Sequence, residues 1–128
     1  MKTITQTYLI HAPLNEVWDS LVNPTHITGW GAGPVVMDDQ VGTKFSLWGG
    51  EIYGTNIEVV KESKLVQEWY SSEDGKWEKP SIATFTLEKV KRGVKLELVQ
   101  TDVPEAAAAS IAAGWKEFYF NPLKAYLE

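Results

Sequence analysis

The stretch that decides the fold runs from residue 83 to residue 115: ATFTLEKVKRGVKLELVQTDVPEAAAASIAAGW. From Ala83 to Glu88 apolar and polar residues alternate, which is the pattern of a half-buried strand. A Lys-Arg-Gly turn leads into a second alternating run, from Val94 to Gln100. Pro104 then opens an alanine-rich segment, and alanine is the strongest helix former. The stretch therefore predicts a β-hairpin followed directly by a helix.

The strand pattern extends upstream from this hairpin. Runs that alternate or are rich in β-branched residues, separated by glycine-rich or charged turns, predict strands at 44–47, 52–60 and 65–70. A similar run at 3–11 predicts a strand at the beginning of the chain. Because consecutive strands are joined by short turns, the six strands should form an antiparallel sheet.

Two short helices are predicted between the first strand and the others. After Pro13, apolar residues recur at helical spacing from Leu14 to Leu21. Asn23-Pro24 pairs a capping residue with a proline, which predicts a second helix that carries Ile27 and Trp30 inward. That helix should end at the glycines of 31–34.

The last predicted element is a long helix over residues 105–127, which at 1.5 Å per residue would be ~34 Å long. Its inward stripe contains Ile111 and Trp115, then Phe118 or Tyr119, and then Pro122 or Leu123. Pro122 removes a backbone hydrogen bond, so we expect a kink near Asn121. This helix alone is long enough to cover the apolar face of the sheet, and the fold class is therefore α+β.

Several motifs occur in the same order in a known family. The sequence resembles the activator-of-heat-shock-protein-90-ATPase-like proteins, a branch of the START-like (SRPBCC) superfamily that also contains the birch-pollen-allergen type. The resemblance implies a helix-grip fold, in which a curved six-stranded sheet wraps around the C-terminal helix, often with a cavity between them. The superfamily contains ligand carriers, cyclases and a co-chaperone. The matching stretches are His11-Ala12-Pro13 with Val17-Trp18, Asn23-Pro24 with Ile27 and Trp30, Gly42-Thr43-Lys44-Phe45, Leu65-Val66-Gln67-Glu68-Trp69, Thr84-Phe85-Thr86-Leu87-Glu88, and Gly114-Trp115 with Tyr119, Leu123-Lys124 and Tyr126-Leu127.

Composition restricts the classes of function. The 128 residues suit a single START-like domain over 1–128, and the net charge of −5 argues against nucleic-acid binding. The chain has no cysteine, no apolar run long enough to insert in a membrane and no apolar signal region at Met1–Thr5, so we expect a cytoplasmic protein.

Catalytic and metal-binding motifs are not found in the sequence. His11 and His26 lie far from any metal-ligand spacing, and no G-x-S-x-G pattern surrounds a serine. The glycines at 29–33 do not form a phosphate-binding fingerprint. We assign no catalytic residue, no metal site and no cofactor.

The informative feature is the aromatic content, which includes six tryptophans. Aromatic side chains in the predicted strands and helix would line a cavity between sheet and helix, where they offer large contact areas. We expect its opening near Ala106–Ala113 and the 31–34 loop, with Trp115 at the floor and Trp77 exposed. The predicted lining consists of Trp30, Phe45, Leu47, Trp48, Trp69, Phe85, Leu98, Gln100, Ile111, Trp115 and Tyr119.

The sequence thus favours non-catalytic binding of a small hydrophobic or aromatic molecule. One alternative is a cyclase or hydrolase that uses Gln100, Tyr8 or Glu68 in the same cavity, although alternation along the strand points Glu68 outward. The other alternative, a co-chaperone that regulates a heat-shock-protein ATPase, comes from the resemblance and would make a chaperone the partner.

Overall fold

The computed structural model describes residues 1–72 and 77–128, and it confirms the predicted order of elements. Part of the loop expected at 71–76 lies outside the described residues. The elements are β1 (Lys2–Ile10), α1 (Leu14–Val22), α2 (Pro24–Trp30), β2 (Lys44–Leu47), the 3-10 turn η1 (Trp48–Gly50), β3 (Ile52–Val60), β4 (Lys64–Ser71), β5 (Ser81–Val90), β6 (Gly93–Val103), α3 (Glu105–Gly114), the π-helical segment η2 (Trp115–Phe120) and α4 (Asn121–Leu127).

In the described part of the chain, the strands form one six-stranded antiparallel sheet in the order β1-β6-β5-β4-β3-β2. The deciding hairpin pairs Phe85 with Leu98 and Leu87 with Leu96, and all four side chains are buried. The predicted alternation is therefore confirmed, because one face of the sheet carries the core.

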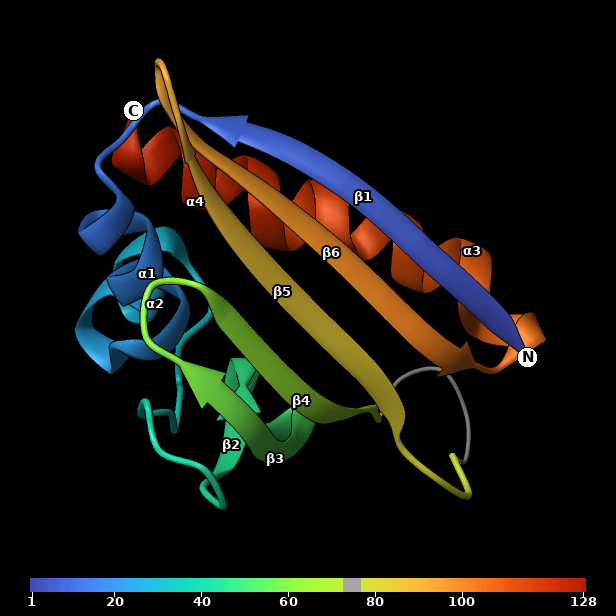
Figure 1. Ribbon diagram of the computed structural model, residues 1–128. Helices are drawn as coiled ribbons and strands as arrows, with labels where there is room; N and C mark the ends of the chain where they lie inside the picture. The colour runs from blue at the N-terminus through green and yellow to red at the C-terminus, as the bar shows by residue number, and fades with distance from the viewer. Residues whose placement is uncertain (73–76) are drawn as a thin grey trace.

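The helical segments α3, η2 and α4 follow one another without a break and run along one face of the bent sheet (Figure 1). This is the helix-grip arrangement that the sequence predicts. Trp115, Tyr119 and Leu123 all face the core and are at most 4% exposed. Of the predicted alternatives, Tyr119 rather than Phe118 and Leu123 rather than Pro122 therefore face the core. The short helices α1 and α2 lie at the α4 end of the sheet (Figure 1).

The irregularity caused by Pro122 lies slightly earlier than the kink expected at Asn121. It takes the form of the π-helical segment η2, which ends immediately before α4. The Asn121 backbone N–H donates to the carbonyl oxygen of Lys116, five residues back. Since proline has no N–H and crowds the carbonyl four residues before it, a widened turn accommodates Pro122 without ending the helix.

The boundaries of α2 are those that the capping residues predict. The Asn23 side chain accepts a hydrogen bond from the Thr25 N–H at 2.9 Å. Gly31 ends the helix with a φ of 112°, a left-handed conformation that glycine adopts without strain. Pro13 differs slightly from expectation, because it precedes the first turn of α1 and does not belong to it.

Candidate functional site

A pocket of about 310 Å³ opens between the beginning of β3, the end of β4 and the part of the long helix from Ser110 to Tyr119. Five of its eleven lining residues are aromatic, and one of these, Phe118, is exposed. The lining consists of Trp48, Glu51, Ile52, Trp69, Ser71, Ser110, Ile111, Gly114, Trp115, Phe118 and Tyr119.

A tight turn places Trp48 and Glu51 at this pocket. Trp48, Gly49 and Gly50 have φ angles of 50°, 66° and 101°, so the backbone reverses sharply after β2. The Trp48 indole N–H donates to the Gly31 carbonyl at 3.0 Å, and the Glu51 N–H donates to the Trp48 carbonyl at 3.4 Å. The turn is therefore anchored to the end of α2.

Stacked aromatic rings form the inner wall. The rings of Trp69 and Trp115 lie 5.1 Å apart at an interplanar angle of 29°, and Trp115 contacts Tyr119 edge-on at 4.9 Å. Trp30 packs behind Tyr119, with ring centroids 4.7 Å apart. Offset and edge-on pairs of this kind add stability beyond their buried area.

A chain of buried hydrogen bonds fixes the orientation of Trp115. Its indole N–H donates to Gln100 Oε1 at 2.7 Å, and Gln100 Nε2 donates to Ser81 Oγ at 2.9 Å. Ser81 Oγ in turn donates to the Trp69 carbonyl at 2.8 Å. Because every polar group in this chain has a partner, the network links the helix to β6, β5 and β4 without a buried unsatisfied atom.

Two ionisable groups belong to the described lining of the pocket, Tyr119 and Glu51. Burial raises the pKa of Tyr119 well above the ordinary value of 10.0, so the phenol stays neutral over the physiological range. The pocket can thus offer aromatic faces, a neutral hydroxyl and one carboxylate.

The structure brings five predicted residues to the pocket: Trp48, Trp69, Ile111, Trp115 and Tyr119. The other six do not line it. Their side chains are buried in the core and at most 5% exposed. These six are Trp30, Phe45, Leu47, Phe85, Leu98 and Gln100.

The opening expected near Ala106–Ala113 overlaps the pocket in part, because Ser110 and Ile111 line it and the alanines of this range do not. Gln6 Nε2 of β1 donates to the Ala112 carbonyl at 2.9 Å, and Ala107 is only 3% exposed. The small alanines let the helix approach β1 closely there. The pocket lies further along the helix, from Ser110 to Tyr119, and the 31–34 loop supports it through Trp48 without lining it.

Sequence reasoning missed six lining residues. Three come from the sheet side and three from the helix, and of the helix residues only Phe118 was considered for the inward stripe, as the alternative to Tyr119. Two of them had a weak signal: Glu51 directly follows the Trp48-Gly49-Gly50 turn, and Ser110 is a polar residue in an alanine run. The six are Glu51, Ile52, Ser71, Ser110, Gly114 and Phe118.

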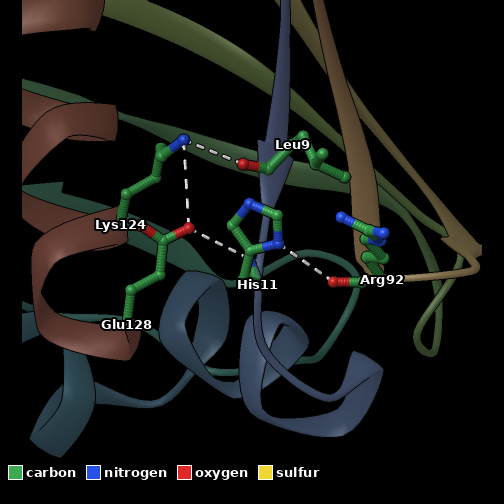
Figure 2. A network of polar contacts seen from close by, with 5 residues as sticks. All are labelled: Leu9, His11, Arg92, Lys124 and Glu128. Carbon is green, nitrogen blue, oxygen red and sulfur yellow. Dashed lines mark hydrogen bonds and ion pairs between the residues drawn. The ribbon is translucent and has the colours of Figure 1, made fainter.

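The histidines take part in packing contacts away from the pocket. As Figure 2 shows, the His11 ring Nδ1 lies 3.1 Å from the Arg92 carbonyl, and its backbone N–H donates to Glu128 Oε2 at 3.0 Å. Lys124 Nζ donates to the Leu9 carbonyl at 2.8 Å and lies 3.9 Å from Glu128 Oε2 (Figure 2). These contacts fasten α4 to the end of β1. His26 contacts the Tyr126 hydroxyl at 2.8 Å.

The three residues considered for acid–base chemistry are dispersed. Gln100 is hydrogen-bonded to Trp115 and Ser81. The Tyr8 hydroxyl donates to Gln6 Oε1 at 2.6 Å. Glu68 is half-buried and does not line the pocket. Within residues 1–72 and 77–128, no group of three or more histidine, aspartate or glutamate side chains is placed to hold a metal ion.

Trp77 corrects another expectation, since it is half-buried and not exposed. Its ring lies 5.8 Å from that of Trp69 and packs against the core.

No helix in the described part of the chain is both long and apolar enough to cross a membrane.

Residues 11–128 match the family model described as "Activator of Hsp90 ATPase homolog 1-like protein". The chain belongs to this family. Because the match covers most of the chain, the family confirms the resemblance drawn from the sequence motifs.

Two curated relatives match most of the chain. An uncharacterised protein of Schizosaccharomyces pombe is 25% identical over 123 residues, covering 94% of this chain and 36% of its own length. The activator of 90 kDa heat shock protein ATPase homolog of Dictyostelium discoideum is 28% identical over 110 residues, covering 85% of this chain and 28% of its own length. The chain thus spans about a third of the length of these relatives.

A solved structure, the HSP90 activator from Plasmodium falciparum, has the same fold. It superposes with a TM-score of 0.89 at 22% identity, over 99% of this chain and 96% of that one.

Proposed function

We propose that this protein binds a small, largely apolar or aromatic molecule without catalysing a reaction. The observation that carries the proposal is the aromatic pocket of about 310 Å³, formed by Trp48, Trp69, Trp115, Phe118 and Tyr119. Small-molecule sites are mostly apolar clefts of roughly 300–1,000 Å³ with a few polar groups, so this pocket suits a ligand of one or two rings.

The distribution of ionisable groups supports binding over catalysis. General acid–base catalysis needs positioned groups whose pKa values suit proton transfer near neutral pH. The burial that raises the pKa of Tyr119 keeps its proton in place, and Glu51 lies at the exposed rim. Tyr119 is therefore suited to donating a hydrogen bond that orients a ligand.

The proposal is tested by filling the pocket from the helix. Ser110 lines the pocket, whereas its neighbour Ala109 is exposed and does not. We expect wild type to bind N-phenyl-1-naphthylamine, a neutral aromatic dye, with a saturable rise in dye fluorescence. Ser110→Trp should weaken binding about tenfold or more, equivalent to 1.4 kcal/mol, and Ala109→Trp should leave it unchanged. Dye binding that is absent in wild type, or equally affected by both substitutions, contradicts the proposal.

A second candidate function, stimulation of a chaperone ATPase, is favoured by the family and by the relatives named as HSP90 activators. If this chain acts in that way, it should raise the rate of ATP hydrolysis by the 90 kDa heat shock protein of its own organism. A steady-state ATPase assay with increasing amounts of the chain measures this. An unchanged rate at saturating chain, with no complex seen by analytical ultracentrifugation, removes this function.

A further inference from the structure

The charge pattern of the pocket points to a particular class of ligand. Among the described lining residues, Glu51 is the one that is charged at neutral pH, and lysine, arginine and histidine are absent from that lining. The remaining described lining is aromatic, aliphatic or neutral polar. Any charged group of a ligand in this pocket therefore meets a single carboxylate and the faces of aromatic rings.

The Glu51 backbone is held firmly at the rim. Its carbonyl accepts hydrogen bonds from the Ser72 N–H at 2.8 Å and from the Ser72 hydroxyl at 3.1 Å. Its N–H donates to the Trp48 carbonyl. The carboxylate forms no ion pair with any described residue, so it is available to a cation from outside.

Aromatic faces beside a carboxylate form an environment that attracts organic cations. The face of an indole ring carries negative quadrupole density and draws an ammonium group toward it, tryptophan most strongly. Trp48 comes from the turn that also positions Glu51, and Trp69 and Trp115 form the inner wall. A ligand with a flat apolar ring and a short ammonium-bearing arm places the ring against the indoles and the charge near Glu51.

We infer that the pocket selects an aromatic ammonium compound over its neutral and anionic counterparts. This inference rests on the proposed function, because it names the ligand class of the same pocket. The net charge of −5 acts in the same direction, since it disfavours approach of an anion.

The experiment compares three ligands that share one ring system: tryptamine (a cation), tryptophol (neutral) and indole-3-propionate (an anion). Dissociation constants come from NMR titrations that follow the indole N–H signals of Trp48, Trp69 and Trp115. We expect tryptamine to bind about fivefold to tenfold more tightly than tryptophol, and indole-3-propionate to bind most weakly. Raising the salt concentration should reduce the difference, because Glu51 is exposed.

The matched variants are Glu51→Gln and Glu16→Gln. Both remove one exposed carboxylate, but Glu16 lies on α1 and not in the pocket. Glu51→Gln should abolish the preference for tryptamine over tryptophol, and Glu16→Gln should retain it. Equal binding of tryptamine and tryptophol to wild type, or an unchanged preference in Glu51→Gln, overturns this inference and leaves the proposed function standing. If none of the three ligands shifts the pocket indole signals, both fail.

Discussion

Replacing Trp115 by alanine is expected to lower the free energy of unfolding by about 3–5 kcal/mol. The side chain is 3% exposed and packs against the rings of Trp69, Phe85 and Tyr119. Its removal leaves a cavity at the centre of the contact between helix and sheet. It also leaves Gln100 Oε1 buried without its donor, which adds to the cost. Urea unfolding followed by circular dichroism measures the change.

Two further variants separate the contributions to this loss. Trp115→Phe keeps most of the ring packing but removes the indole N–H, so it should cost about 1–3 kcal/mol, the usual penalty for an unsatisfied buried acceptor. Phe118→Ala, an exposed aromatic on the same helical segment, should cost less than about 1 kcal/mol. A Trp115→Ala cost as small as that of Phe118→Ala would show that the helix is not held through Trp115.

The elements of this fold were predictable because their signals are local. The alternation at 83–88 and 94–100 fixes which side chains face the core, and in the structure those strands pair with the expected inward faces. Asn23 begins a helix through a side-chain hydrogen bond, and Gly31 ends it through its left-handed backbone conformation. Each of these signals involves only residues that are close in sequence. Such signals do not depend on where the rest of the chain goes.

The site was less predictable, because a pocket depends on contacts between distant segments. The alanines of α3 were compatible with either a void or close contact. The hydrogen bond from Gln6, more than 100 residues away in sequence, decides for close contact at Ala112. In the same way, Phe85 and Leu98 belong to the inward face of the sheet, yet the helix covers them completely. Glu51 reaches the pocket only because the turn after β2 is fastened to Gly31 through Trp48.

Gly54→Ala is the second substitution with a large expected effect, about 3 kcal/mol or more. Gly54 lies in β3, opposite Trp69 of β4 and next to Phe45 of β2. A Cβ atom added there would lie 1.8 Å from the Glu68 carbonyl oxygen and 3.0 Å from Phe45 Cε1. Because the nearest atom belongs to the backbone, no side-chain rotation relieves the collision, and the pairing of β3 with β4 must shift.

That shift should also reach the pocket, since Ile52, Trp69 and Ser71 line it from these two strands. We therefore expect Gly54→Ala to lose both stability, measured by urea unfolding, and dye binding. Gly114→Ala is the matched control for stability alone, because Gly114 itself lines the pocket. Gly114 has helical backbone angles, and an added Cβ would lie 4.0 Å from Phe118 Cδ2, at ordinary contact distance. Alanine there should stabilise the helix by roughly 0.5–1 kcal/mol. The same added methyl group should thus lower the free energy of unfolding at Gly54 and raise it at Gly114. A Gly54→Ala protein as stable as wild type would mean that β3 and β4 do not approach each other as closely as described.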